Sequence, residues 1–436
     1  MFAKSKFLTV TVSLLLLITS AYILLRQTDS PEHRNSIESV QTSSVQPARL
    51  ITRTLHPLDN ADDAESLFAE APHAADSVAL IVPENAIPGE LLVYIADQQA
   101  LERYAQDAVR QGARILRYDK RLGTLRLAYG DDKSLANKLL SSLPQDGQAD
   151  FNYIISLPDL PLVQAGQEMA SFDGNVLSWL GLEGDHSQFG SGVTIAVIDS
   201  GVQPHRSFSG RAIKQISLIS EGEASYHEYS AHGTAVTSII TGNGDVNGLS
   251  PAANIYSFQV LNADGVGDVY ALSQAIVGAA DRGAQVINLS LGTYSDSFLL
   301  QKAVNYALSK NVVLVAAAGN DGLTLLPYPA AYAGVIAVGA VDANGIEAYF
   351  SNSGNDVDIL APGVDIHSAW SNNQLVLFSG TSAATPFVSA AIAAILSQNP
   401  TFSTQQAVAF LLDNATVYQS ENKASQTILN LQILNN

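Results

Sequence analysis

Residues 193–201, VTIAVIDSG, join a strand to a turn and decide the fold class. The first six residues are apolar or β-branched and show no polar alternation, which is typical of a strand buried on both faces. Asp199 follows this strand and precedes a Ser-Gly pair that favours a turn. Because strands buried on both faces belong to parallel sheets, the segment predicts an α/β protein with Asp199 at the carboxyl end of a strand.

Further apolar runs of strand length follow along the chain, with helical patterns between them. The runs cover residues 255–260, 286–289, 312–317 and 335–338. The helical patterns include residues 269–282 and 298–310. Strands that alternate with helices predict a parallel sheet with helices on both faces, so we expect a three-layer α/β domain over residues 174–436.

Three motifs bring reactive side chains to the ends of such elements. Asp199 ends its strand, His232 opens the helical segment HGTAVTSIITG, and Ser382 lies at the start of the apolar segment SGTSAATPFVSAAIAAIL. A serine hydroxyl needs a neutral imidazole to accept its proton, and the imidazole needs a buried carboxylate to fix its tautomer. The three residue types therefore predict acyl transfer, in which Ser382 attacks, His232 moves the proton and Asp199 orients His232.

A fourth motif, VVLVAAAGNDG at residues 312–322, ends an apolar strand at Asn320. An amide donor at this point can bind a developing oxyanion, and the first N–H groups of the helix that begins near Ser382 favour the same charge. The alternative is that Asn320, which precedes Asp-Gly, only makes a turn. We interpret it as an oxyanion donor because the other three motifs accompany it.

The order Asp199, His232, Ser382 is that of the subtilisins. The motifs D-S-G, H-G-T, A-A-A-G-N and G-T-S-x-A-T-P also follow one another in the order of that family. Residues 174–436 therefore resemble the subtilisin (subtilase) family of serine proteases. The resemblance implies a serine endopeptidase that hydrolyses polypeptides without a required cofactor.

The same resemblance implies the substrate-binding residues. Two segments are expected to form the walls of the primary specificity pocket: Ser290, Leu291, Gly292, and Ala317, Ala318, Gly319. A third segment is expected to pair with the substrate backbone by strand addition: Val260, Leu261, Gly265 and Gly267.

Several positions depart from the family pattern. Ala383 and Phe387 stand where Met and His are common, and Ala235 and Ser238 are unusual in the histidine motif. None of these positions has a triad role. The loop at 242–249 is shorter than the loop that holds calcium in many relatives, which argues against a structural calcium ion there. We predict no metal site, since His205 and His227 show no metal-ligand spacing with His232.

Residues 87–157 form a separate pattern of strands and helices in the order βαββαβ, which predicts a small α+β domain of the ferredoxin-like kind. In it, residues 99–112 predict a helix with four apolar side chains on one face: Leu101, Tyr104, Ala105 and Val109. Its place before a subtilisin-like domain resembles the propeptide of many relatives, a folding chaperone and inhibitor. The resemblance implies that Ser382 cuts the connector at 158–173 in cis and that the freed domain then inhibits. An ordinary accessory domain is the alternative.

The N-terminus carries the signal for export. Lys4 and Lys6 precede a largely apolar run of 19 residues at 7–25, longer than the core of most signal peptides. Residues 1–26 are thus a signal anchor or a signal peptide, the length favours the anchor, and we expect a protein that faces outward from the membrane or is secreted. The Ser-, Gln- and Pro-containing residues 27–86 are expected to form a disordered linker.

Composition excludes other classes of protein. The formal net charge of −19 argues against a nucleic-acid partner, because phosphate binding needs a basic surface. The chain has no cysteine, which removes disulfides and thiolate sites. Two alternatives to an endopeptidase stay open at this point: a catalytically silent binding protein that keeps the groove, and an esterase that does not cut peptides.

Overall fold

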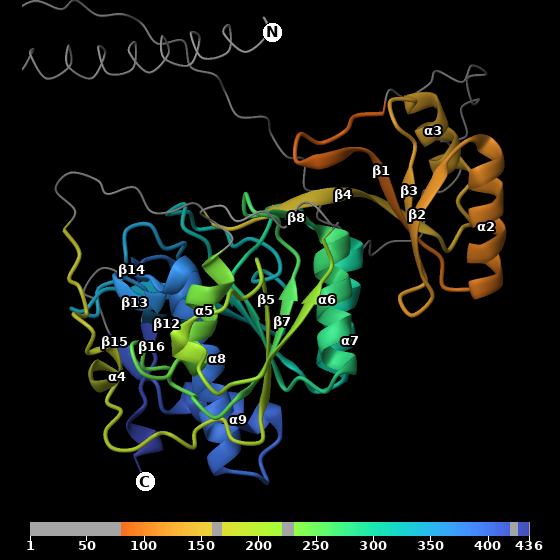
Figure 1. Ribbon diagram of the computed structural model, residues 1–436. Coiled ribbons are helices and arrows are strands. Elements are labelled where there is room, and N and C mark those ends of the chain that lie inside the picture. Colours follow the sequence, from red (N-terminus) through yellow and green to blue (C-terminus); the bar gives the residue numbers. More distant parts are fainter. Residues whose placement is uncertain (1–79, 159–167, 220–230, 419–425, 436) are drawn as a thin grey trace, which may run out of the picture. The chain divides into compact units, whose positions relative to one another are not determined.

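A computed structural model describes residues 80–158, 168–219, 231–418 and 426–435 of the chain (Figure 1). All of these belong to one unit, Ser77–Asn436. The predicted anchor or signal peptide at 1–26 lies outside the described residues, as do residues 27–79 of the predicted linker and residues 159–167 of the predicted connector.

The described residues up to 157, here called the N-terminal domain, form one sheet with two helices. The elements are β1 (Ala86–Tyr94), α2 (Gln98–Gln111), β2 (Arg114–Asp119), β3 (Thr124–Ala128), α3 (Lys133–Ser141) and β4 (Gln148–Ser156). Neighbouring strands are antiparallel in the order β2-β3-β1-β4. This is the predicted succession of strands and helices.

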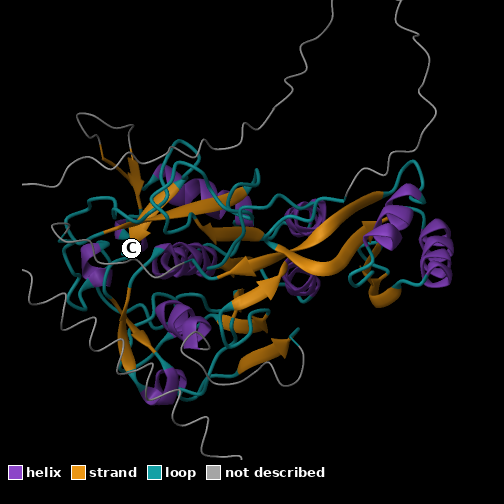
Figure 2. Cartoon of the chain, turned by 90° about the horizontal axis from the view of Figure 1, so that it is seen from above, coloured by secondary structure: helices purple, strands orange, loops and turns teal. Residues whose placement is uncertain are grey.

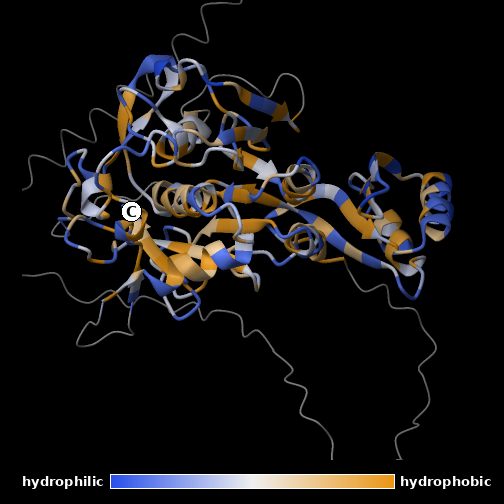
Figure 3. Cartoon of the chain, turned by 90° about the horizontal axis from the view of Figure 1, so that it is seen from below, coloured by the Kyte–Doolittle hydropathy of each residue, from blue (hydrophilic) through white to orange (hydrophobic). Residues whose placement is uncertain are grey.

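The buried face of helix α2 differs at one position from the face that the sequence predicts. Asp97 caps its first turn by accepting the N–H of Ala100 at 2.6 Å, and Gly112 ends it with φ +110°. The buried side chains are those of Leu101, Tyr104, Ala105 and Ala108. The prediction that Val109 belongs to this face is wrong, because the buried positions follow the helical repeat and leave Val109 51% exposed. The outward residues of α2 are largely polar (Figure 3).

Alternate residues of β1 serve different cores. Leu91 and Val93 pack with α2 and α3 in the core of the N-terminal domain. Leu92 points to the other face of the sheet and belongs to a core cluster made mostly of residues after 195. One face of this small sheet is therefore covered by its own helices and the other by the rest of the chain.

The described residues from 168 onward, here called the C-terminal domain, are built on a sheet of nine strands. Its order is β15-β16-β12-β11-β10-β9-β5-β7-β6, and every neighbouring pair except β15 and β16 is parallel. The strands are β5 (Thr194–Asp199), β6 (Ile213–Ser217), β7 (Asn254–Gln259), β9 (Val286–Leu289), β10 (Val313–Ala317), β11 (Val335–Val341), β12 (Ile359–Pro362), β15 (Thr416–Tyr418) and β16 (Gln426–Ile428).

Helices cover both faces of this sheet, so the predicted three-layer α/β fold is confirmed (Figures 1 and 2). One face packs against α5 (His232–Thr241), α8 (Thr381–Gln398) and α9 (Thr404–Asp413). The other packs against α6 (Val269–Asp281) and α7 (Phe298–Ser309). The smaller elements are α4 (Val176–Trp179), β8 (Val266–Asp268), and the hairpin of β13 (Ile366–Ala369) and β14 (Leu375–Phe378).

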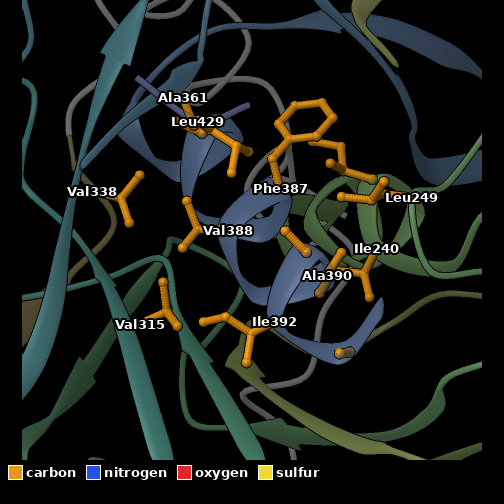
Figure 4. Close-up of a cluster of buried hydrophobic side chains, with 14 of the residues drawn as sticks. Ile240, Leu249, Val315, Val338, Ala361, Phe387, Val388, Ala390, Ile392 and Leu429 are labelled. Atoms are coloured by element: carbon orange, nitrogen blue, oxygen red, sulfur yellow. The ribbon is translucent and has the colours of Figure 1, made fainter. Parts of the chain in front are cut away.

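Strand β5 illustrates the division between the two faces. Val197 belongs to the cluster around α8, whereas Ile198 belongs to the cluster around α6 and α7. In the first cluster Phe387, Val388 and Ile392 of α8 lie among side chains of the sheet and of α5 (Figure 4). Among the described helices, α8 alone is long and apolar enough to cross a membrane, and 89% of that stretch is buried in the fold. Helix α8 is the core helix of this domain. Its buried side chains hold its first turn, which contains Ser382, in position.

Candidate active site

The end of β5 and the start of α5 bring Asp199 and His232 together. Nδ1 of His232 lies 2.9 Å from Oδ1 and 3.0 Å from Oδ2 of Asp199. Both side chains are buried, and Oδ1 also accepts the N–H of Ser200 at 2.7 Å. A buried carboxylate at Nδ1 holds the proton on that nitrogen, so Nε2 is the atom of this imidazole that can accept another proton. The ring of Phe378 packs edge-on against the imidazole, with 5.1 Å between the two ring centroids.

The glycine after His232 is required by this close approach. A Cβ atom at Gly233 would lie 2.3 Å from the carbonyl oxygen of Gly201 and 3.2 Å from the Asp199 side chain. The N–H of Gly233 donates to Ser200 Oγ at 3.1 Å, which ties the start of α5 to the turn after β5. Any larger residue at this position would push the imidazole away from its carboxylate.

Ser382 is the second residue of α8, and its hydroxyl is nearly buried. Its Oγ donates to the carbonyl oxygen of Ser290 at 3.1 Å, and Ser290 Oγ donates to the carbonyl oxygen of Ser382 at 3.1 Å. This reciprocal pair joins the start of α8 to the segment after β9. Since a hydroxyl has one proton, the bond to Ser290 uses the proton that His232 would have to accept.

Asn320 is fixed against the residue before Ser382. Its Oδ1 accepts both the backbone N–H and the hydroxyl of Thr381, each at 2.9 Å. Thr381 Oγ1 in turn accepts the N–H of Gly319 at 3.2 Å. The carboxamide oxygen of Asn320 accepts both of these bonds from Thr381. They fix the rotation of the carboxamide group and therefore the direction of its nitrogen beside the first turn of α8.

The segments expected to bind substrate backbone are paired with residues of the N-terminal domain. Strand β4 pairs antiparallel with β8, and Ile155 stands opposite Gly267. A Cβ atom at Gly267 would lie 2.2 Å from the carbonyl oxygen of Val260, so glycine is required at this edge. Val260 and Leu261 are fully buried behind it.

The pairing continues beyond β4. Ser156 and Gly292 exchange two backbone hydrogen bonds of 3.1 Å, and the N–H of Leu157 donates to the carbonyl of Gly265 at 3.1 Å. An extended segment of the N-terminal domain thus lies between two of the segments predicted to bind substrate. Peptides that add a strand to a sheet edge bind in this way.

A cavity of about 450 Å³ opens beside this segment. Its lining includes Gly292, Gly319, Asp321 and Pro327 of the C-terminal domain and Leu157 of the N-terminal domain. The other predicted wall residues stand behind this surface or beside Ser382: Ser290, Leu291, Ala317 and Ala318 are all buried.

Sequence reasoning missed part of the cavity rim. Tyr294, which lines the cavity, donates its hydroxyl to Asp321 at 2.5 Å and accepts the amide of Asn352 at 2.7 Å. Burial, and then the hydrogen bond to Asp321, raise the pKa of Tyr294 to about 12. The buried Asn352 also accepts the N–H groups of Asp321 and Leu323 at 3.0 and 2.9 Å, which shapes the loop after Asn320. No motif marks Asn352, because it meets this loop only in the fold.

Polar side chains also connect the two domains at the start of α6. Arg126 Nε forms an ion pair with Glu90 Oε2 of its own domain at 2.8 Å. Its Nη1 forms a second ion pair, at 3.1 Å, with Oδ2 of Asp268, the N-cap of α6. Burial raises the pKa of Asp268, although Arg126 opposes the shift. Asn152 Oδ1 accepts the N–H of Tyr270 at 3.2 Å in the first turn of α6.

No group of three or more metal-binding side chains occurs in the part of the chain that the structure describes. His205 is engaged in local structure: its Nδ1 accepts the N–H of Ser207 and its Nε2 contacts the carbonyl of Gln374, both at 3.1 Å. His227 lies outside the described residues. In the loop at 242–249, a Cβ atom on Gly248 would lie 2.3 Å from the nitrogen of Gly242, so this turn is tight.

Comparison with known proteins gives matches over most of the C-terminal domain. A profile of the subtilase family (Peptidase_S8) matches residues 190–432. The chain is 38% identical to Subtilisin BL of Lederbergia lenta over 246 residues, which are 56% of this chain and 90% of that protein. It is 35% identical to the Thermophilic serine proteinase of Bacillus sp. (strain AK1) over 324 residues, 72% of this chain and 79% of that protein.

Solved structures give a similar result. Fervidolysin from Fervidobacterium pennivorans, described as a keratinolytic enzyme related to subtilisin, aligns with a TM-score of 0.70 over 82% of this chain and 62% of that chain. At 22% identity it supports the fold alone. A point mutant of the protease domain of PatA is 33% identical, with a TM-score of 0.52, over 58% of this chain and 95% of that chain.

Proposed function

Since this chain belongs to the subtilase family and is a subtilisin-like serine endopeptidase, we propose that Asp199, His232 and Ser382 are its catalytic triad. The observation that carries the assignment is the buried contact of 2.9 Å between His232 Nδ1 and Asp199 Oδ1. It leaves Nε2 as the proton acceptor and would stabilise the imidazolium that forms.

In the proposed reaction, Ser382 Oγ attacks the carbonyl carbon of a substrate peptide bond while its proton passes to His232 Nε2. The C–N bond breaks when His232 gives this proton to the leaving amine, and an acyl-enzyme remains on Ser382. A water molecule, deprotonated by His232, then hydrolyses the ester. The hydroxyl must first leave the Ser290 carbonyl, to which it donates at 3.1 Å.

Asn320 is proposed to stabilise the negative oxygen that forms during attack. Its Oδ1 is held by two bonds of 2.9 Å from Thr381, so its amide group is oriented before substrate arrives. Preorganised donors of this kind avoid reorganisation at the moment of reaction. The N–H groups at the start of α8 would add to the same field.

The substrate is proposed to lie as an extended strand between Gly265–Gly267 and Ser290–Gly292, with one side chain in the cavity near Gly319. Support comes from the segment at 154–157, which uses Gly265, Gly267 and Gly292 for antiparallel backbone pairing. On the side of the C-terminal domain the cavity lining includes Gly292, Gly319, Tyr294 and Pro327, which suits apolar side chains, together with the charged Asp321.

The N-terminal domain is proposed to be a propeptide: Ser382 cuts the connector at 158–173 in cis, and the freed domain then inhibits the enzyme until it is degraded. Support comes from the same pairing, because a segment that occupies the substrate strand position excludes other polypeptides. Export is proposed from residues 1–26, which serve as an anchor or a signal peptide. No cofactor is proposed to be required, and calcium dependence is to be tested by chelation.

A labelled fluorophosphonate, which reacts with an activated serine, tests the triad together with casein hydrolysis. We expect the processed wild-type protein to be labelled and to degrade casein, and Ser382→Ala to do neither. Labelling without casein hydrolysis would indicate an esterase. Absence of labelling in processed, folded wild type would indicate a silent binding protein.

A further inference from the structure

Asn320 stands between two residues whose backbones are both bound by Asn352. The backbone N–H of Asn352 donates to the carbonyl oxygen of Gly319 at 2.9 Å. Its side-chain Oδ1 accepts the N–H of Asp321 at 3.0 Å and that of Leu323 at 2.9 Å. Asn352 is fully buried, in the segment between β11 and β12, and belongs to none of the four sequence motifs of the site. The loop that carries the proposed oxyanion donor is therefore held by a distant segment of the chain.

The surroundings of the Asn352 side chain fix the orientation of its amide group. Its Nδ2 donates to the hydroxyl of Tyr294 at 2.7 Å and to the carbonyl oxygen of Leu325 at 3.0 Å. A rotation of the group by half a turn would point the nitrogen at the two N–H groups of the loop, so that donors would face donors. Because the group is buried, each bond that is not made would be costly. Asparagine supplies both kinds of partner at this position.

Gly319 makes room for this side chain. A Cβ atom at position 319 would lie 2.4 Å from Asn352 Nδ2, and the φ angle of +99° lies in the region that favours glycine. The glycine of the motif A-A-A-G-N thus has a reason in the fold, because it allows the amide of Asn352 to reach the loop around Asn320.

Two different elements hold Asn320. Thr381, at the start of α8, donates two bonds of 2.9 Å to its side-chain oxygen, and Asn352 binds the backbone on either side of it. The first contact fixes the rotation of the carboxamide group, and the second fixes the position of the loop. An oxyanion donor has to lie about 2.7–3.1 Å from the negative oxygen. A displacement of about 1 Å can lower a rate by about a hundredfold.

We propose that Asn352 is a positioning residue that keeps the loop of Asn320 at the distance needed to stabilise the oxyanion. The inference rests on the proposed role of Asn320 as oxyanion donor. Asn352 acts through Asn320, so its contribution is made when the negative charge forms during attack. Its loss should therefore lower kcat more than it raises KM.

The test compares wild type, Asn352→Ala and the control Asp342→Ala, all made as full chains and assayed as processed enzyme on one peptide substrate. Asp342 is a matched control because it is 4% exposed and its Oδ1 accepts the N–H groups of Asn344 and Ile346 in the turn after β11. Both variants should lower Tm. We expect Asn352→Ala to lower kcat by about tenfold to a hundredfold, less than Asn320→Ala, and Asp342→Ala to keep kcat within about twofold of wild type.

Three results would overturn the proposal: a wild-type kcat in folded Asn352→Ala, a loss confined to KM, or an equal loss of kcat in Asp342→Ala. If Asn352→Ala does not fold, Asn352→Ser is measured in its place. It removes less volume and keeps a hydroxyl that is too short for the bonds to the loop, so the same loss of kcat is expected and the same results count against the proposal.

A double-mutant cycle tests whether Asn352 acts through Asn320. In a chain that already carries Asn320→Ala, we expect Asn352→Ala to change kcat by less than about twofold, because the donor that it positions is absent. A further loss as large as the one in the wild-type background would refute a positioning role toward Asn320.

Asn320→Ala alone separates the two levels of failure. If this variant loses kcat as expected and Asn352→Ala does not, the inference about Asn352 fails and the proposed function stands. If Asn320→Ala keeps the kcat of wild type, the proposed oxyanion donor is wrong, and the role of Asn352 fails with it.

Discussion

The two sheets of this protein use their faces differently. The nine-stranded sheet is covered on both faces by helices of its own domain, and neighbouring residues of β5 enter separate apolar cores. The sheet of the N-terminal domain is covered by its own helices on one face only. Its other face contacts the C-terminal domain through Leu92 and through polar groups such as Glu90 and Arg126.

Under the proposed propeptide role, the nine-stranded sheet holds a permanent core, and the contact of the small sheet with the C-terminal domain is one that is released. Apolar burial on two faces stabilises a fold at all times, whereas a polar surface stays soluble once a partner leaves. A propeptide has to meet the second requirement. Variants of the proposed catalytic residues, of the two cores and of the charged contact test this distinction between the two sheets.

Replacing Ser382, the proposed nucleophile, should give the largest effect on activity. Ser382→Ala removes the Oγ that would attack, so we expect no detectable peptidase activity and an uncut precursor that keeps β4 paired with β8. Activity on casein and the size of the purified chain are the measurements. Normal processing of this variant in a host without other subtilases would show that the two sheets are not separated by self-cleavage.

Replacing Asn320, the proposed oxyanion donor, should give a smaller loss of activity. Asn320→Ala is expected to lower kcat by about 10²–10³ with little change in KM, a magnitude measured in subtilisin itself and carried over here. Steady-state kinetics on a peptide substrate measure the split. The control is Asn344→Ala, which removes an exposed amide in the turn after β11. A loss confined to KM in Asn320→Ala would contradict the proposed role.

The two faces of β1 can be compared at adjacent positions. Leu91 and Leu92 are both fully buried, one against α2 and α3 and the other in the cluster with α6 and α7. Each change to alanine should cost about 2–5 kcal/mol. In the Ser382→Ala precursor, we expect Leu91→Ala to raise amide exchange throughout the N-terminal domain and Leu92→Ala to raise it chiefly at the β4–β8 pairing. Identical exchange patterns would refute the division into two cores.

The ion pairs of Arg126 should contribute less to the stability of the docked precursor than either leucine. Arg126→Met leaves Glu90 and Asp268 without their shared cation, and the Arg126 side chain is only 20% exposed. We expect it to destabilise the docked precursor by about 1–3 kcal/mol, below the range for a fully buried pair because of the remaining exposure. Arg110→Met, at an ion pair whose arginine is 72% exposed, is the control and should change little. Equal thermal shifts in the two variants would contradict the prediction.

Sequence patterns were sufficient wherever the deciding interactions are local. The apolar run before Asp199 predicts a buried strand, and the structure has this strand. The short strands β6 and β15 were not predicted, because edge strands need fewer apolar residues and resemble loops in sequence. Val109 was assigned to the wrong face because only tertiary packing decides between neighbouring apolar residues of a helix.

The site shows the same limit. The contact between His232 and Asp199 follows from motifs whose roles are stereotyped. The bond from Ser382 to Ser290, and the contacts of Asn352 with Tyr294 and Asp321, join residues that are distant in the sequence. Such pairs carry no local signal and become visible only when the loops at the edge of the sheet are assembled.

The smallest expected effect concerns the pH dependence of docking. Burial raises the pKa of Asp150, a residue of β4, although hydrogen bonds from Tyr153 and from the backbone of Phe298 at the start of α7 oppose the shift. A raised pKa means that the folded, docked state disfavours the charged carboxylate. The contribution of Asp150 to stability is therefore full below its unfolded pKa, about 3.9, and is lost as the pH rises through its higher folded pKa.

Asp150→Asn keeps the shape of this side chain and removes its charge, so it should flatten that part of the pH profile. In the Ser382→Ala precursor, we expect Asp150→Asn to raise the Tm at pH 7, and we expect the difference in Tm from the parent to shrink as the pH falls toward the unfolded pKa of about 3.9. Asp146→Asn, at an exposed position, is the control and should follow the parent at every pH. A lower Tm for Asp150→Asn at neutral pH would show that the bonds to Tyr153 and to the start of α7 outweigh burial. The carboxylate would then favour docking, and the polar face of the small sheet would depend on its negative charge.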